Sequence, residues 1–170
     1  DATEQAAAAL IALAREKDLP ANIDWASILV AWAQGHRGDR AAAIAEISEI
    51  AERLGMKDPG YLAMLAELLL VDGRIGEGLT LVDDLLAVVE EKDHRQYEAD
   101  LHRLRGELLM SQASGEDDKV EAGEALHRAI SVAVEQGALS FELRARMSHA
   151  RLSAGTDSAD QAMRDLRKTY

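Results

Sequence analysis

The sequence predicts an all-α fold made of consecutive helical pairs, and three observations lead to that prediction. Hydrophobic residues make up 48% of the 170 residues but aromatic residues only 4%, so alanine and leucine dominate the apolar positions, as is typical of helices. The apolar residues recur at steps of three and four in segments of about 12–18 residues. Short stretches rich in Gly, Asp and Pro separate these segments. The length suits one domain with a hydrophobic core.

The breaks divide the chain into one helix and four helical pairs. They are "KDLPAN", "GHRGDR", "GMKDPG", "VDGR", "EKDHR", "SGEDDK", "EQGALS" and "SAGTDS". We expect a helix over residues 1–18, left from a preceding pair, and helical pairs over 22–54, 61–92, 95–136 and 139–168. A carboxylate can accept hydrogen bonds from the free N–H groups of a first helical turn, so three aspartates are predicted to introduce helices: Asp24, Asp39 and Asp157.

Small residues recur at matching places in the four pairs. In the first helices they are Ala31, Ala66, Gly106 and Ala150, and in the second helices Ala43, Gly78, Ala122 and Ala162. A large aliphatic residue follows each of the second set by four positions: Ile47, Val82, Leu126 and Leu166. The second small residues are 35, 44 and 40 positions apart, close to the roughly 34 of tetratricopeptide repeats. Small residues let helices approach closely. The spacing predicts a right-handed α-α superhelix of tetratricopeptide (TPR-like) pairs, a single solenoid over residues 1–170.

Gly106 is predicted to be a close-contact point between paired helices. It interrupts the helical pattern of "YEADLHRLRGELLM", where glycine costs about 0.5–1 kcal/mol relative to alanine. Its place corresponds to Ala31 and Ala66, so closer packing near Ala122 and Leu126 offsets the cost. We expect Gly106→Ala to be mild, or stabilising by up to about 1 kcal/mol, and Gly106→Leu to destabilise by about 1–3 kcal/mol.

Composition and charge exclude several classes of protein. The net charge is −12, and residues 1–100 carry 20 acidic against 9 basic side chains, which disfavours direct binding to nucleic acid or anionic lipid. No apolar run approaches the roughly 20 residues of a membrane-spanning helix. There is no cysteine, so disulfides and thiolate sites are excluded, and we expect a cytoplasmic protein. The first residues lack an initiator Met and a basic region, so the chain is expected to be a fragment of a longer one.

Two stretches carry a resemblance to a known family. They are "YEADLHRLRGELL" and "EALHRAISVAVEQGALSFELRARMSHARL", and similarity extends to "LAREKDLP" and "YLAMLAELLLVDGRIGEGLTLVDDLL". The chain resembles the C-terminal TPR-like region of large bacterial signalling ATPases. Some of these are similar to adenylate or guanylate cyclases fused to an AAA-type ATPase, and others carry a LuxR-type or winged-helix DNA-binding domain. The stretch "GHRGDRAAAIAEI" departs from the family pattern.

The resemblance implies a sensing or interaction arm, with the nucleotide-binding and catalytic motifs in upstream domains. This chain has no phosphate-binding "GxxxxGK[ST]" motif, and no "GxGxxG" motif precedes a helix. We therefore expect no enzyme activity of its own and no cofactor. The expected partners are a protein or peptide and the upstream domains, and a homo-oligomer is compatible with this. Two alternatives are a free-standing TPR adaptor that binds peptides and a small enzyme whose site the sequence does not reveal.

Arginines on the first helices of the last two pairs are the candidate binding residues. They are Arg103, Arg105, Arg144 and Arg146, with Arg151 nearby. First helices line the concave surface of TPR-type solenoids, where arginines could receive an acidic peptide or a phosphate group. The alternative is that these arginines pair within the chain, with Asp100, Glu107 and Glu142.

One histidine invites a metal-site interpretation. His102 lies one helical turn after Glu98, and His94 extends the same stripe. Isolated His–Glu pairs rarely complete the ligand set of zinc, and no second ligand helix is identifiable, so we expect a polar helix stripe and no metal.

Other polar and aromatic residues are expected to have structural roles. Adjacent acidic pairs are more typical of a solvated helix face than of acid–base catalysis, because neighbouring helical side chains point apart: Asp83–Asp84, Glu90–Glu91 and Asp117–Asp118. Tyr97 is expected to pack with its hydroxyl in water. Trp25 and Trp32, seven positions apart on one helix face, are predicted to pack in the core or between repeats.

Overall fold

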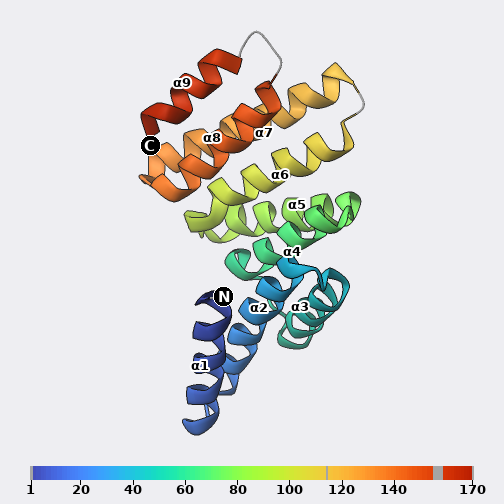
Figure 1. Ribbon diagram of the computed structural model, residues 1–170, viewed down its shortest axis with the longest axis vertical. Coiled ribbons are helices and arrows are strands. Elements are labelled where there is room, and N and C mark those ends of the chain that lie inside the picture. The colour runs from blue at the N-terminus through green and yellow to red at the C-terminus, as the bar shows by residue number, and fades with distance from the viewer. Residues whose placement is uncertain (1, 114, 155–158, 170) are drawn as a thin grey trace. The chain divides into compact units, whose positions relative to one another are not determined.

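The computed structural model describes residues 2–113, 115–154 and 159–169 (Figure 1). Over these ranges the chain forms nine α-helices and one short 3₁₀-helix, and no strand, so the all-helical prediction is confirmed. No helix in the described ranges combines the length and the hydrophobicity required to span a bilayer. The chain divides into two compact units, residues 1–72 (unit 1) and 73–170 (unit 2).

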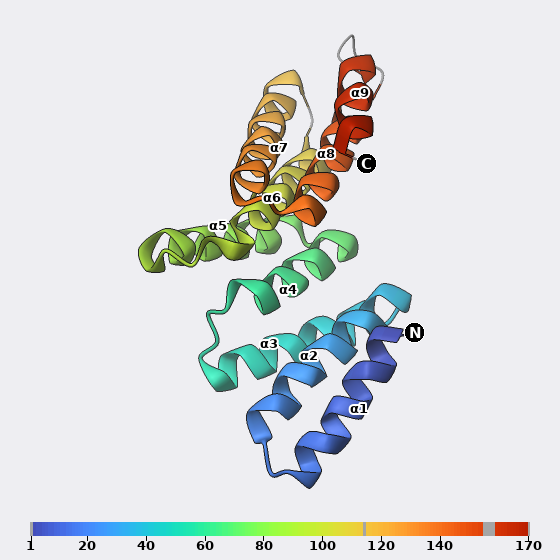
Figure 2. The same ribbon diagram turned by 90° about the vertical axis from the view of Figure 1, so that its left-hand side faces the viewer.

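Unit 1 contains four helices: α1 (Ala2–Glu16), α2 (Pro20–Arg37), α3 (Arg40–Leu54) and α4 (Pro59–Asp72). Each packs on the next, and α2 also packs on α4. In Figures 1 and 2, α2 lies between α1 and α3. The buried residues of α3 keep three- and four-residue spacing (Ala43, Ile44, Ile47 and Ile50), so one face of this helix packs and the opposite face meets solvent.

Unit 2 contains α5 (Ile75–Lys92), the 3₁₀-helix η1 (Arg95–Tyr97), α6 (Glu98–Gln112), α7 (Glu116–Gln136), α8 (Leu139–Ser153) and α9 (Ala159–Thr169). Consecutive α-helices pack together, and α6 also packs on α8. Both views place α6 between α5 and α8 (Figures 1 and 2). Because neighbours surround α6, apolar residues such as Leu101, Leu104 and Leu108 are fully buried, and polar residues between them are buried too.

The helices lie close to the predicted ranges. Helix α1 falls within residues 1–18, and the range 95–136 holds α6 and α7. The ranges 22–54 and 139–168 each correspond to two consecutive α-helices, but α2 begins two residues earlier, at Pro20, and α9 ends one residue later, at Thr169. The range 61–92 holds most of α4 and all of α5, and these belong to different units. The grouping into TPR-like pairs of one solenoid stays a prediction.

The predicted helix caps are wrong in part. Helix α2 begins at Pro20, so Asp24 lies inside it and pairs through both carboxylate oxygens with Arg53, at 2.8 and 3.1 Å. Asp39 precedes α3 but makes no side-chain cap hydrogen bond. Asp157 lies outside the described residues. Asp58 caps α4 instead, because the backbone N–H groups of Gly60 and Tyr61 donate to its Oδ1.

The small residues of the predicted repeat are mostly buried. Ala31, Ala66 and Ala122 are fully covered, Ala43, Gly78 and Ala162 are nearly so, and Ala150 is half-buried. Two glycines approach partners that the repeat did not predict: Gly35 lies against Ala43 and Leu68, and Gly78 against Leu108 of α6.

Gly106 of α6 lies directly against α7. A Cβ added there would be 2.7 Å from Cγ of Leu126 and 3.2 Å from the carbonyl oxygen of Ala122. The partners are those that the repeat spacing gives, but the approach is closer than alanine allows. The expectation that Gly106→Ala is mild is therefore wrong for this geometry, because a methyl group already overpacks the contact.

Candidate functional site

Helix α6 buries charged side chains on two opposite sides. Glu98, Asp100 and Arg103 are each less than a tenth exposed. At 100° per residue, Asp100 and Arg103 lie on the side opposite to Glu98 and His102. Buried charges are costly unless they are paired, so the two sides indicate two separate polar clusters in unit 2.

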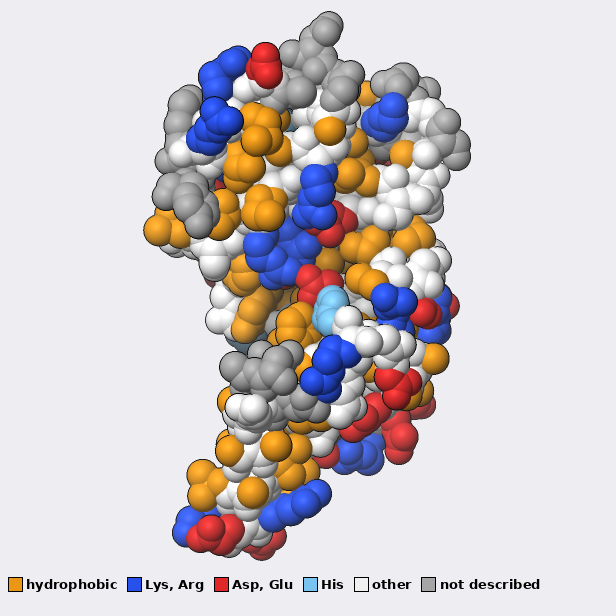
Figure 3. Space-filling view, in the orientation of Figure 1, with side chains coloured by type: hydrophobic (Ala, Val, Ile, Leu, Met, Phe, Trp, Pro, Cys, Tyr) orange, Lys and Arg blue, Asp and Glu red, His pale blue; other side chains and the backbone are white. Residues whose placement is uncertain are grey.

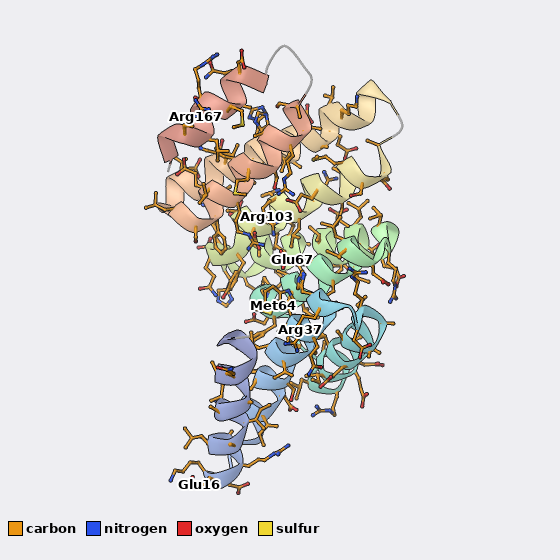
Figure 4. All side chains as sticks on the ribbon, viewed as in Figure 1. Glu16, Arg37, Met64, Glu67, Arg103 and Arg167 are labelled. Carbon is orange, nitrogen blue, oxygen red and sulfur yellow. The ribbon has the colours of Figure 1, made fainter. Side chains whose placement is uncertain are left out.

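The first cluster, the α6–α8 network, centres on Arg103, which is labelled in Figure 4. The Nε of Arg103 donates to Oδ1 of Asp100 at 2.6 Å, and its Nη1 lies 3.2 Å from Oε2 of Glu107. Asp100 also accepts from Nη1 of Arg144 on α8, at 3.3 Å. Ion pairs therefore join α6 to α8 where the two helices pack.

Glu107 connects the network to the second half of α8. The hydroxyl of Ser148, which is fully buried, donates to Oε1 of Glu107. The Nη2 of Arg151 lies 3.1 Å from the same oxygen and 3.2 Å from Oγ of Ser148. Figure 3 shows basic and acidic side chains side by side over α6 and α8. The side chain of Arg151 is 64% exposed and that of Arg103 is 4% exposed, so the network runs from the surface into the interior.

All the candidate arginines take part in ion pairs within unit 2, as in the alternative interpretation. Arg105 pairs with Asp83 and Glu121, each at 2.9 Å, and Arg146 pairs with Glu142 at 2.8 Å. Arg103 is buried and does not present its guanidinium to solvent. The binding of an external ligand by these arginines stays a prediction.

The second cluster lines a pocket of about 790 Å³, the α5–α7 pocket. Its lining is apolar at Leu86, Ala87 and Val89, acidic at Asp83, Glu90, Asp93 and Glu98, and basic or neutral at Arg95, His102 and Arg128. The α5 side chains Asp83 and Glu90 and the α7 side chain Arg128 are exposed, whereas Glu98 is buried. Helix α6 therefore forms the floor, and α5 and α7 form the walls.

Glu98 on this floor is held by two arginines. Arg95 of η1 donates to Oε2 at 2.6 Å, and Arg128 of α7 donates to Oε1 at 3.2 Å. Burial raises the pKa of the Glu98 carboxyl, but the Arg95 hydrogen bond and the charges of Arg95 and Arg128 lower it by more, so the net pKa lies below its ordinary value. Glu98 is therefore ionised at neutral pH.

His102 lies beside Glu98 without a hydrogen bond to it, because its Nε2 is 3.9 Å from Oε1. Burial lowers the pKa of the imidazole, Arg128 and Arg105 lower it further, and Glu98 acts in the opposite direction. The net pKa is below the ordinary value of about 6.5, so the ring is neutral at pH 7. Across the described part of the chain, no three or more His, Asp or Glu side chains are placed to hold a metal ion.

A second histidine site links α7 to α8. The rings of His127 and His149 lie 4.5 Å apart between centroids, at 53°. Burial lowers the pKa of His149, and the charges of His127 and Arg146 act in the same direction, against Asp165.

The tryptophans connect α2 to α4 in unit 1. Trp25 stacks on Tyr61 with ring centroids 5.7 Å apart, and Nε1 of Trp32 donates to Oε2 of Glu67 at 3.1 Å. Trp25 is 41% exposed, so these residues pack between helices and not in the innermost core. Tyr97 packs against Phe141, with ring centroids 6.2 Å apart.

The acidic pairs on α5 are solvated as expected. Asp83, Asp84, Glu90 and Glu91 are all exposed. Asp83 and Glu90 also line one pocket, however, which the sequence interpretation did not foresee. The side chains of the Asp117–Asp118 pair lie outside the described part of the structure.

Sequence reasoning missed Ser148, Arg95 and Arg128. Ser148 had a signal, because it is a polar residue within the apolar pattern of its helix. Its buried hydroxyl donates to Glu107. Arg95 and Arg128 had none, because they meet at Glu98 from η1 and from the middle of α7.

Comparison with known proteins finds a relative of this chain among curated proteins. No family model matches the chain, and no solved structure matches it. A curated, uncharacterized protein of Rhizobium meliloti (strain 1021) is 34% identical over 122 residues, which are 69% of this chain. The match covers 12% of that protein, so the chain spans a small part of the relative's length.

Proposed function

We propose that this chain is a protein-interaction and regulatory arm of a multidomain bacterial signalling protein, either adenylate cyclase-like or a transcriptional-regulator ATPase. In this proposal the helices form a right-handed TPR-like superhelix, and the arm has no catalytic activity of its own. The resemblance of residues 97–110 and 139–152 to such repeat regions motivates the proposal.

The helix packing within each unit is the observation that supports it best. In unit 1, α2 packs on α3 and also on α4, and in unit 2, α6 packs on α7 and also on α8. Contact of a helix with both its next and its second-next neighbour is typical of α-solenoids, which bury their core by stacking pairs. The Rhizobium relative supports the second part of the proposal, because the chain corresponds to a short portion of a much longer protein.

The α6–α8 network offers a mechanism for regulation. The side chains of Arg144 and Arg151 are 42% and 64% exposed, and their carboxylate partners Asp100 and Glu107 are mostly buried. An acidic peptide of a partner would compete for the exposed guanidinium groups. The negative charges of Asp100 and Glu107 would then be compensated mainly by Arg103 on their own helix. The packing of α8 on α6 would change as a result. Through that change the arm would report binding to the upstream ATPase.

The complete parent protein tests the proposal. ATP hydrolysis should be measured for the parent, for the double variant Arg144→Glu and Arg151→Glu, and for the control Arg164→Glu on α9, an exposed arginine bonded to Gln161 in the described structure. We expect the double variant to change the rate or its response to a partner, the control to leave it unchanged, and the isolated chain to show no turnover. Equal rates for all three parent proteins would contradict regulation through this network. If the complete coding sequence held no ATPase domain, the proposal of a regulatory arm would be wrong, and the free-standing adaptor would be favoured.

A further inference from the structure

The α5–α7 pocket is large enough to take an amino-acid side chain. Its volume of about 790 Å³ lies within the range of about 300–1,000 Å³ typical of ligand sites. Leu86 and Ala87 give one wall an apolar surface, and the charged groups of Asp83 and Glu90 stand on the same helix. A ligand with an aliphatic stem and a charged end matches this combination.

The charges of the lining favour a positive ligand. Four carboxylates and two guanidinium groups line the pocket. Both guanidinium groups, those of Arg95 and Arg128, already donate to Glu98. Glu90 has no hydrogen-bond or ion-pair partner within the described ranges of the chain. Asp83 already pairs with Arg105 at 2.9 Å, so Glu90 supplies the negative charge of the pocket lining that is available to a ligand.

An anionic ligand fits the same pocket poorly. It would lie beside the carboxylates of Asp83, Glu90 and Asp93, and the two guanidinium groups of the lining already pair with Glu98. His102 would add no positive charge, because burial keeps its pKa below the ordinary value. Like charges repel across the few ångströms of a partly desolvated pocket.

We propose that the α5–α7 pocket binds the lysine or arginine side chain of a basic peptide from a partner protein. The methylene groups of that side chain lie along Leu86 and Ala87, and its cationic end lies at Glu90 and Asp83. This site is on the opposite side of α6 from the α6–α8 network, so it does not depend on the regulatory role proposed for that network.

Binding of a labelled basic peptide tests this proposal. The probe is fluorescein-labelled (Gly-Arg)₃-amide, and its counterpart has glutamate in place of each arginine. Fluorescence anisotropy measures the affinity of the whole chain, and ¹⁵N–¹H NMR locates the contact. We expect the arginine peptide to bind, the glutamate peptide not to bind, and the amide signals of Leu86, Glu90 and His102 to shift.

Adjacent residues provide a matched control. Glu90→Lys and Glu91→Lys change the net charge equally on two exposed neighbours of α5, but Glu90 lines the pocket and Glu91 does not. Glu90→Lys should weaken binding about threefold to fivefold, as for loss of one ion pair at an exposed site, and Glu91→Lys less than about twofold. Glu90→Gln and Glu91→Gln repeat the comparison with smaller changes, and thermal unfolding checks that each variant folds.

Three results would overturn the proposal. One is equal weakening by the two lysine variants, which would indicate general attraction to an acidic protein. Another is tighter binding of the glutamate peptide. The third is a set of NMR shifts confined to residues outside the pocket lining.

Discussion

Adding one methyl group at position 106 tests how closely α6 and α7 pack. The Cβ of an alanine there would lie 2.7 Å from Cγ and 2.8 Å from Cδ2 of Leu126, and 3.2 Å from the carbonyl oxygen of Ala122. Carbon atoms normally pack at about 3.5–4.0 Å. Leu126 is fully buried and the carbonyl belongs to the backbone of α7, so neither neighbour can move away freely. The two helices must separate locally.

The expected free energy follows from two opposing effects. Overpacking of a close contact costs about 1–3 kcal/mol. The change from glycine to alanine inside a helix gains about 0.8–1 kcal/mol. We therefore expect Gly106→Ala to lower the free energy of unfolding by up to about 2 kcal/mol, and Gly106→Leu to lower it by more.

Gly123 provides the matched control on the facing helix. A Cβ there would lie 3.6 Å from Cδ2 of Leu152, which is an ordinary contact distance. Gly123→Ala should therefore stabilise by up to about 1 kcal/mol through helix propensity alone. Denaturant unfolding followed by circular dichroism measures both variants, and their midpoints should move in opposite directions.

A double-mutant cycle of Gly106→Ala with Leu126→Ala tests whether contact with Leu126 causes the loss of stability. Leu126→Ala alone should cost about 2–5 kcal/mol, because it leaves a cavity in the core. Its cost should be smaller by about 0.5–3 kcal/mol in the Gly106→Ala protein, where the lost side chain also relieves the overlap. A Gly106→Ala protein as stable as Gly123→Ala, or a cycle without coupling, would refute the close contact between α6 and α7.

Three further predictions concern charge and metal. Arg103→Met should destabilise by about 1–3 kcal/mol, because Asp100 and Glu107 lose their buried guanidinium partner and keep only those on α8. Arg105→Met, which breaks half-exposed ion pairs, should cost about 0–1 kcal/mol in the same denaturant assay. The pKa values of His102 and His149 lie below the ordinary value in the folded chain. As the pH falls from 7.5 to 5.5, these histidines therefore bind protons in the unfolded chain before they do so in the folded chain. The free energy of unfolding should decrease as the pH falls, by at most about 1.4 kcal/mol per pH unit for each histidine. His102→Gln should reduce that slope, and an unchanged slope would contradict the assignment. Chelators should leave the melting temperature unchanged, because structural zinc would contribute to the folding free energy; a clear decrease would restore the metal-site interpretation.

The helices were predictable from the sequence because their signals are local. Alanine and leucine at three- and four-residue spacing, with Pro20 and Pro59 at helix starts, place each helix close to its observed range. The cap at Asp24 failed because two local signals competed. Proline is favoured in the first helical turn, so α2 starts four residues earlier, at Pro20. The carboxylate of Asp24 pairs with Arg53 of α3 instead.

The α5–α7 pocket was not predictable, because its lining comes from three α-helices and η1 and extends from Asp83 to Arg128. The α6–α8 network was predictable in part. The paired carboxylates Asp100 and Glu107 were weighed as partners for arginines, since their spacing on α6 is local. The burial of Arg103 depends on how α8 packs on α6, and the spacing of apolar residues along the sequence does not predict that packing.

The charged interior of α6 also constrains how this sequence can evolve. Asp100 and Arg103 form an ion pair inside the protein, so a substitution at either position removes the nearest charged partner of the other and leaves only more distant ones until the other position changes as well. Among homologous chains these two positions should therefore vary together, exchanging an ion pair for an apolar pair in linked steps. Exposed pairs such as Arg74 and Glu77 carry no such penalty and should drift independently. Helix α6 should thus be the segment of unit 2 in which covariation is strongest and single substitutions are rarest.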